Sequence, residues 1–230
     1  LIHLLKNDEA ERVREAAASA LGKFIYLREL EEIDPPEATL AEEALLESIY
    51  QASENLHVRR RALEAVAYSG DQRIPPIIEA AYYSDDEKMQ VSAIFAMGRN
   101  ADERWLTTVI TELDNPNNEI RFEACRACGE LEAKDAVGKL IELIEFDADL
   151  EIQEMAVWAL GRIGGNVARE ALEACLDHDQ EVLALAAEAA LEELNIFDDG
   201  MMLYDFSKYS GDKNGDDFID LFDLSDYSRN

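Results

Sequence analysis

Alanine recurs at two fixed places in six segments of this 230-residue chain. Counted from an apolar anchor residue in each segment, the fourth and the seventh residues are always Ala. The anchors are Val13, Val58, Met89, Ile120, Ile152 and Val182, which lie 45, 31, 31, 32 and 30 residues apart. A period of about 30 residues with two small positions is typical of a helical solenoid, in which similar helix pairs stack on one another. A solenoid binds through extended faces, so we look for function there rather than in a deep pocket.

Each segment has an apolar first helix, a short polar turn and an Ala-bearing second helix. Short oxygen-bearing side chains in the turn can cap the second helix. Three residues before each anchor stand Ala10, Asn55, Asp86, Asn117, Asp149 and Asp179, and Asp8 or Glu9 can substitute for the Ala. Nine residues past each anchor stand Gly22, Ala67, Gly98, Gly129, Gly161 and Leu191, mostly small enough for close approach of neighbouring backbones. The pattern predicts an all-α solenoid of about six helix pairs over residues 1–197.

Three places depart from the period. The first spacing is about 14 residues too long, which predicts an insertion at 25–38. Its Asp34-Pro35-Pro36 step is expected to break the helix before residues 39–51 resume it. The last repeat has Leu183 where Arg14, Arg59 and Arg121 stand in other repeats, which is typical of a capping repeat. After Phe197 the periodicity ends, and residues 198–230 are expected to form a flexible acidic tail.

The formal charge of −30 excludes most partners that carry many phosphates, so we expect neither nucleic acid nor an anionic membrane as a partner. No segment approaches the roughly 20 apolar residues of a membrane span. Three cysteines within helix-like segments favour reduced thiols and a cytoplasmic setting. No signal peptide is visible, but the chain begins at Leu1 inside a helix-like segment, so the sequence does not decide where the natural protein starts.

The pattern Asp-x-Asp-x-x-Ile/Val-x-x-x-Ala-x-x-Ala-Leu-Gly, clearest in residues 147–161 and 8–22, resembles the HEAT repeat. The likeness is to its short bacterial form, which is found in phycobilin lyase subunits, and it covers residues 1–197. The resemblance implies a right-handed α-α superhelix. It leaves function open, because the family includes scaffolds, lyase subunits and a few enzymes. Two activities of relatives are rejected: the His-Glu iron ligands of deoxyhypusine hydroxylase are absent, and DNA-glycosylase members are basic where they meet DNA.

The second helices of such a stack are expected to line its concave side. Positions two, three, six and ten past the anchor should then point away from the core. The strongest partner-binding candidates at these positions are aromatic, Met and Arg side chains, which dominate binding hot spots. They are Phe95, Arg99, Phe122, Arg126, Met155, Trp158 and Arg162. One hypothesis is a groove for a segment with apolar and acidic side chains; the alternative is a register error of one residue, which would place the aromatic side chains in the core.

Sequence motifs for metal binding or catalysis are weak in this chain. Cys125 and Cys128 have the spacing of half a zinc site, but no second pair of ligands is evident and Cys128 falls in a core column. No nucleophile has an identifiable base, and no glycine-rich phosphate loop occurs. The sequence therefore predicts a protein that is not an enzyme and needs no cofactor.

The tail contains one segment similar to a calcium loop of the EF-hand or dockerin type. Its candidate ligands are Asp212, Asn214, Asp216, Asp220 and Asp223. The alternative is a chance match within an Asp-rich tail. The tail also alternates acidic and aromatic residues, so it could instead dock in the chain's own groove.

These observations predict a non-enzymatic scaffold or adaptor that binds a protein segment on the concave face. Two alternatives remain open: a phycobilin-lyase-like subunit that works with a partner subunit, and a module that docks in a calcium-dependent way through the tail.

Overall fold

The computed structural model describes residues 1–51 and 53–203, with side chains up to residue 196. The chain divides into two compact units, Leu1–Leu194 and Asn195–Asn230. The described residues form α-helices joined by turns, as predicted, with two short 3-10 helices. The elements are α1 (Ile2–Asn7), α2 (Glu11–Glu29), α3 (Pro35–Tyr50), α4 (Leu56–Val66), α5 (Ile74–Tyr82), α6 (Glu87–Asn100), η1 (Glu103–Trp105), α7 (Leu106–Glu112), α8 (Asn118–Glu130), η2 (Lys134–Ala136), α9 (Val137–Phe146), α10 (Leu150–Ile163), α11 (Asn166–Cys175) and α12 (Glu181–Leu203).

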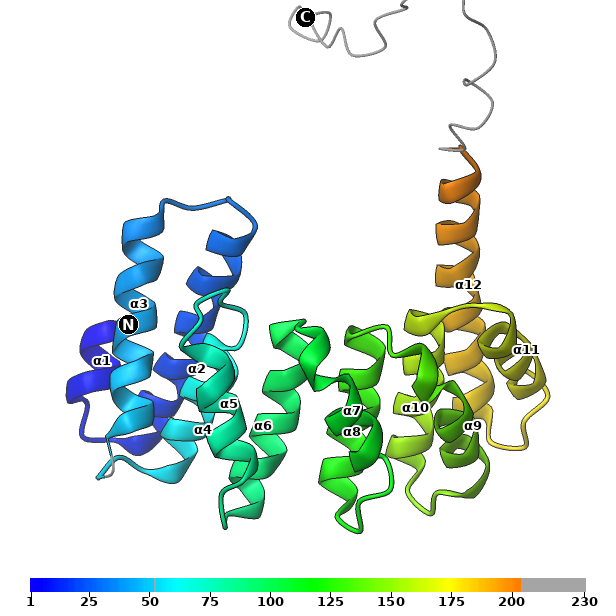
Figure 1. Cartoon of the computed structure of the whole chain (residues 1–230), viewed down its shortest axis with the longest axis horizontal. Helices are drawn as coiled ribbons and strands as arrows, with labels where there is room; N and C mark the ends of the chain where they lie inside the picture. Colours follow the sequence, from blue (N-terminus) through cyan, green and yellow to red (C-terminus); the bar gives the residue numbers. More distant parts are fainter. Residues whose placement is uncertain (52, 204–230) are drawn as a thin grey trace, which may run out of the picture. The chain divides into compact units, whose positions relative to one another are not determined.

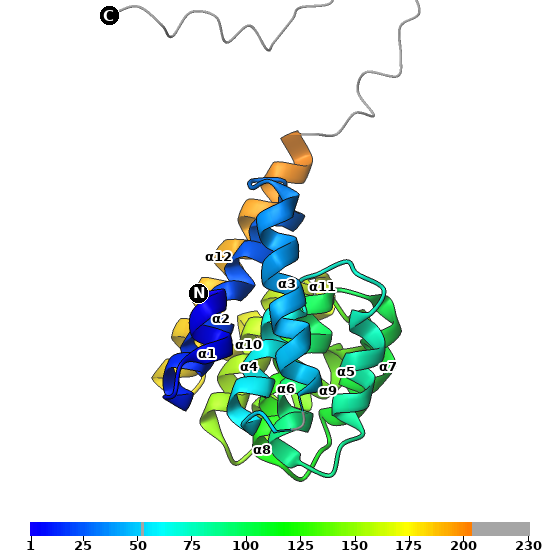
Figure 2. The same cartoon turned by 90° about the vertical axis from the view of Figure 1, so that its left-hand side faces the viewer.

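The first unit is a stack of helix pairs. In the first five repeats, the first helix packs on the second helix of its own repeat, as α3 does on α4 and α9 on α10. The second helices pack in the order α2, α4, α6, α8, α10 (Figure 1). Seen from the end of the stack, α2, α4 and α10 lie on one side, and α5 and α7 lie on the other (Figure 2). The solenoid predicted from the alanine period is therefore confirmed.

Polar caps begin the second helices as expected. Asn55, Asp86, Asn117 and Asp149 are the N-cap residues of α4, α6, α8 and α10, and each side chain accepts a hydrogen bond from a backbone N–H in the first turn. Ala10 caps α2 without a side-chain acceptor, but Asp8 accepts from its backbone N–H at 2.9 Å. These bonds satisfy donors that the first helical turn leaves unpaired.

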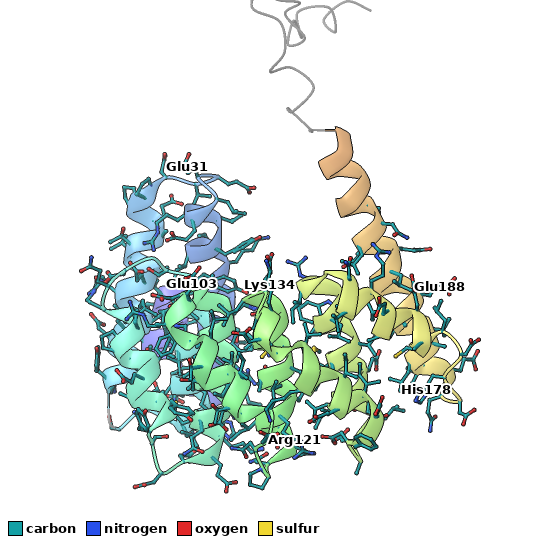
Figure 3. The ribbon with its side chains drawn as sticks, turned by 45° about the vertical axis from the view of Figure 1, so that its right-hand side comes forward. Glu31, Glu103, Arg121, Lys134, His178 and Glu188 are labelled. Carbon is teal, nitrogen blue, oxygen red and sulfur yellow. The ribbon has the colours of Figure 1, made fainter. Side chains whose placement is uncertain are left out.

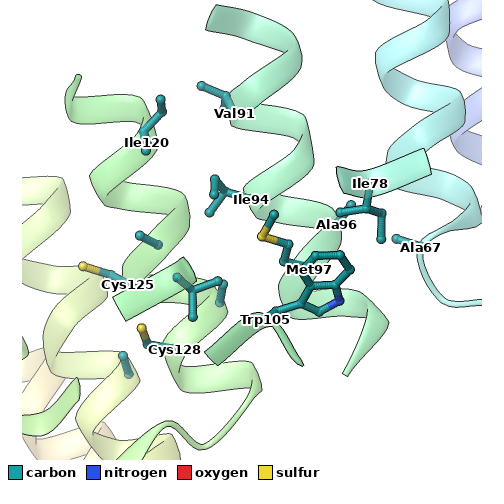
Figure 4. Packing of buried hydrophobic residues seen from close by; sticks show 14 of the residues in the cluster. Ala67, Ile78, Val91, Ile94, Ala96, Met97, Trp105, Ile120, Cys125 and Cys128 are labelled. Atoms are coloured by element: carbon teal, nitrogen blue, oxygen red, sulfur yellow. The ribbon is translucent and has the colours of Figure 1, made fainter. Parts of the chain in front are cut away.

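The alanines of the middle repeats hold the second helices together. Ala65, Ala96, Ala127 and Ala159 are at most 5% exposed. A Cβ added to Gly98 would lie 2.9 Å from the Cα of Ala127. A larger residue at either place would force two packed backbones apart. Around them, Met97 of α6 and Trp105 belong to one buried cluster with Cys125 and Cys128 of α8 (Figure 4).

The register predicted for the last repeat was wrong. Leu183, Ala187 and Ala190 are buried, whereas Ala186 is only partly buried and Ala189 is exposed. His178, in the turn before α12 (Figure 3), accepts from the N–H of Gln180 through Nδ1, just as Asp147 accepts from the N–H of Asp149 before α10. The anchor is therefore Leu183, which restores the spacing of 31 residues from Ile152. Leu183 does not occupy the Arg column, and Asp179 is not the cap.

The insertion lengthens two helices rather than forming a separate break. The helix α2 continues through Glu29, and Asp34 is the N-cap of α3, whose first turn contains Pro35 and Pro36. The expected resumption at residue 39 was therefore four residues late, because Pro lacks the N–H that the first turn leaves unpaired anyway. Inside the hairpin, Arg28 pairs with the buried Glu42 at 3.0 Å and donates to Ser69 Oγ at 3.0 Å.

A repeated hydrogen bond closes the polar turns, and the sequence pattern did not predict it. The residue after the anchor donates to the backbone carbonyl six residues earlier in four repeats. The donors are Arg14, Gln90, Arg121 and Gln153. Arg121 (Figure 3) also pairs with Asp147 of the next turn at 2.8 Å, which ties adjacent repeats together.

No helix in the described part of the chain is long and apolar enough to cross a membrane. The helix α12 continues to Leu203, past the predicted end of the periodicity at Phe197. The tail candidates for calcium, Asp212, Asn214, Asp216, Asp220 and Asp223, lie outside the described residues, as do residues 204–230 of the tail that was expected to dock in the groove.

Candidate binding surface

The predicted binding residues lie on three consecutive second helices. Phe95 and Arg99 lie on α6, Phe122 and Arg126 on α8, and Met155, Trp158 and Arg162 on α10. The first six are half-buried, and Arg162 is exposed. Phe122, Met155 and Trp158 pack with one side against the core, so the aromatic side chains are neither fully free nor part of the core. Val91, which the same positional rule placed on the surface, is buried at 7% exposure.

Phe95 lies between two arginines. The guanidinium carbon of Arg126 is 4.3 Å from the centre of its ring, and that of Arg99 is 5.5 Å away. Arg99 also lies 5.7 Å from the ring centre of Tyr68 on the loop after α4. Cations attracted to ring faces in this way hold both partners in place. The cluster therefore forms a fixed central part of the second-helix face.

Both of these arginines already have carboxylate partners. Arg99 pairs with Glu130 at 3.2 Å, and Arg126 pairs with Glu123 one turn earlier on α8. Burial raises the pKa of Glu123 and of Glu130, although the nearby arginines oppose that shift. At neutral pH these pairs cancel most of the positive charge at the centre of the face. An acidic segment therefore gains less here than the sequence alone indicates.

A hollow of about 510 Å³ lies on the N-terminal part of the face. Tyr26, Tyr68 and Phe95 line it, and the ring centres of the two tyrosines are 5.2 Å apart. The charged residues that line it are Lys23, Arg61, Glu64 and Arg99. Arg61 pairs with both Glu64 and Glu15. Sequence reasoning missed Tyr26, because it lies in the lengthened end of α2, where no other repeat has a counterpart.

A second hollow, of about 400 Å³, lies between α8 and α10. We call it the C-terminal hollow. Its lining residues are Phe122, Glu151, Glu154, Met155 and Trp158. The indole of Trp158 packs over Gly129 of α8 so closely that a Cβ at Gly129 would lie 2.7 Å from Cζ3 of the ring. The missing side chain at Gly129 thus fixes where the Trp158 ring can lie.

The cysteines are packing residues. All three thiols are free and buried. Burial raises the pKa of Cys125, and it raises the pKa of Cys128 to about 12, so both remain protonated and unreactive near neutral pH. Within residues 1–51 and 53–203, no group of three or more His, Cys, Asp or Glu side chains is arranged to hold a metal ion.

Comparison with known proteins supports the repeat assignment. A family model described as HEAT repeats matches residues 74–144 and 106–192, which together span more than half of the chain. A further model, described as HEAT repeat, matches residues 1–27. No curated protein matches the chain.

Solved structures of two designed or engineered proteins share the fold, and a phycocyanin lyase complex is similar at a lower TM-score. A designed armadillo repeat protein in complex with the peptide (KR)4 is 20% identical, with a TM-score of 0.52, and the match covers 84% of this chain and 98% of that chain. An engineered protein is 20% identical, with a TM-score of 0.51 and coverage of 85% and 95%. The complex of CpcE and CpcF of phycocyanin lyase from Nostoc sp. PCC7120 is 17% identical, with a TM-score of 0.48 and coverage of 84% and 92%. Identities this low show the fold and not the function, whereas the matches to the family models show the family. The chain belongs to the HEAT-repeat family.

Proposed function

We propose that this protein is a non-enzymatic scaffold or adaptor that binds a segment of another protein along its second-helix face. The observation that carries the proposal is the row of half-buried aromatic side chains on three consecutive helices, Phe95, Phe122 and Trp158, with a hollow on each side of the central arginines. Aromatic and Arg side chains in preformed hollows lose little conformational entropy when a partner binds.

The dimensions favour an extended segment. Neighbouring helices pack about 8–10 Å apart, so the face from α4 to α10 is about 25–30 Å long. An extended chain advances about 3.3 Å per residue, and about eight or nine residues would cover that length. A short linear segment can therefore contact both hollows at once.

Selection from a displayed library of random peptides tests this function. The full chain is immobilised, and each selected peptide is then measured against Trp158→Ala, Phe95→Ala and the control Phe146→Ala. Phe146 is also aromatic and is 78% exposed. It lies at the end of α9, which is the first helix of its repeat and so is not part of the second-helix face. Truncation of a hot-spot aromatic residue costs about 2 kcal/mol or more, roughly 30-fold in affinity. The proposal would be contradicted if Phe146→Ala lowers the affinity of the selected peptides, or if Trp158→Ala and Phe95→Ala both leave it unchanged.

A phycobilin-lyase-like subunit is a second candidate, and the N-terminal hollow favours it. Tyr26 and Tyr68 can pack against an apolar ring system, and Lys23, an exposed cation, can pair with a carboxylate on that ring system. Addition of bilin should then change its visible absorbance with the wild-type chain and less with Lys23→Ala. An unchanged spectrum would exclude this candidate.

The other predictions concern the setting and the tail. A cytoplasmic location fits three free buried thiols but is a prediction. Calorimetry with and without residues 198–230 tests calcium-dependent docking. The same truncation should raise the affinity for selected peptides if the tail competes for the face.

A further inference from the structure

We propose that the C-terminal hollow binds the side chain of a lysine or arginine in the partner segment. This inference rests on the proposed function and adds the chemistry of the partner at one position. It reverses the charge expected from the sequence, which emphasised the arginines of the face. The structure shows that the charged residues lining this hollow are carboxylates.

Glu151 and Glu154 carry those charges. They lie three residues apart on α10, so their side chains share one side of the helix, and both are exposed. Within the described residues, neither carboxylate has a hydrogen bond or an ion pair, whereas Glu123 and Glu130 are each paired with an arginine. Glu151 and Glu154 can therefore accept a cation without breaking an existing contact.

The apolar lining suits the stem of a basic side chain. Phe122, Met155 and Trp158 line the hollow beside the two carboxylates. The methylene groups of Lys or Arg can pack on these three residues, and the charged end can reach the glutamates. A cation is also attracted to the face of an aromatic ring, most strongly to that of Trp. Because Trp158 already packs over Gly129, its ring needs little ordering when the ligand binds.

The volume of the C-terminal hollow and the net charge of the chain both favour a basic side chain. A hollow of about 400 Å³ accommodates one long side chain and a short stretch of backbone. The net charge of −30 attracts cationic segments from a distance and repels acidic ones. Attraction by net charge would be equal for any exposed pair of glutamates, so the aromatic lining is what makes this site specific.

Fluorescence anisotropy with a labelled peptide of alternating Arg and Ser tests the site. The full chain is compared with Glu151→Gln/Glu154→Gln and with the control Glu170→Gln/Glu173→Gln. The control pair is exposed, has the same spacing on α11 and changes the net charge equally, but it lies on a first helix and does not line this hollow. We expect the first double variant to bind about 3- to 10-fold more weakly than the control. We also expect Trp158→Leu to bind more weakly, and the matching Glu-Ser peptide not to bind.

The outcomes separate this inference from the proposed function. An equal loss of affinity in the two double variants would show that net charge alone explains the binding, and it would overturn the inference. The inference is also wrong if the display-selected peptides lose affinity with Trp158→Ala but not with Glu151→Gln/Glu154→Gln, although the scaffold function then stands. If the selected peptides bind Phe95→Ala and Trp158→Ala as tightly as wild type, the proposed scaffold function is wrong, and the inference that rests on it is wrong as well.

Discussion

Replacement of Gly129 by Ala tests whether close packing of the second helices also builds the binding surface. The new Cβ would lie 2.7 Å from the Trp158 ring and 3.0 Å from the Cα of Ala159. The ring can rotate, but the Ala159 backbone belongs to a packed helix, so α8 and α10 must separate slightly. Overpacking of this kind costs about 1–3 kcal/mol, occasionally more. The higher helix propensity of Ala offsets about 0.8–1 kcal/mol of this cost. We expect a net loss of up to about 2 kcal/mol relative to wild type.

Gly138→Ala is the matched control. Gly138 lies in α9 and is exposed, and a Cβ added there would meet no atom within 4 Å. The same substitution should stabilise the protein there, by about 0.5–1 kcal/mol, because only the helix-propensity gain applies. Urea unfolding followed by circular dichroism gives both midpoints. The emission of Trp158, obtained as the difference between each protein and its Trp158→Phe form, should shift to the red in Gly129→Ala only.

Two results would refute the reasoning. If Gly129→Ala is as stable as Gly138→Ala, the helices adjust at no cost and the glycine column does not control their approach. If Gly129→Ala is destabilised but its Trp158 emission does not shift, the column holds the stack together and does not position the ring.

Two further predictions concern ion pairs between elements. Arg28→Ala leaves Glu42 buried without its partner and should cost about 3–5 kcal/mol, whereas Arg28→Met combined with Glu42→Met should recover most of that loss in urea midpoint. Burial of Asp147 opposes its ionisation, but hydrogen bonds from Arg121 and from the N–H of Asp149 outweigh burial and lower its pKa. This carboxylate therefore stabilises the fold above its unfolded pKa, and the contribution is lost as pH falls through the lower folded pKa. Asp147→Asn should be less stable than wild type at neutral pH, and the two unfolding midpoints should converge in acid; parallel pH curves would contradict this account.

The alanine period was enough to predict the architecture because each repeat obeys local rules. Small residues at helical spacing identify a close contact, and Asn117 or Asp149 at a helix start identifies a cap. These signals depend on a few neighbouring residues, so they can be seen in one sequence. The same locality explains the error in the last repeat. Its run of Ala residues fits two registers, which the burial of Leu183 and Ala190 and the hydrogen bond from Gln180 to His178 distinguish.

The sequence predicted only part of the binding face. Residue type and position placed Phe95, Arg126 and Trp158 on one face, but they did not reveal which charges were already paired. Arg126 meets Glu123 on its own helix, and Arg99 meets Glu130 on the next helix. Pairing across helices depends on the distance between neighbouring helices and on side-chain direction, neither of which a periodic pattern specifies.

The sequence by itself thus determined a stack of HEAT-like helix pairs and the residues that hold it together, because those contacts repeat and obey local spacing. Only the tertiary structure decided that Arg99 and Arg126 are paired with carboxylates while Glu151 and Glu154 are available. The physical reason is that ion pairing depends on side-chain direction and on which side chains packing brings within reach of one another, as Arg99 of α6 and Glu130 of α8 illustrate.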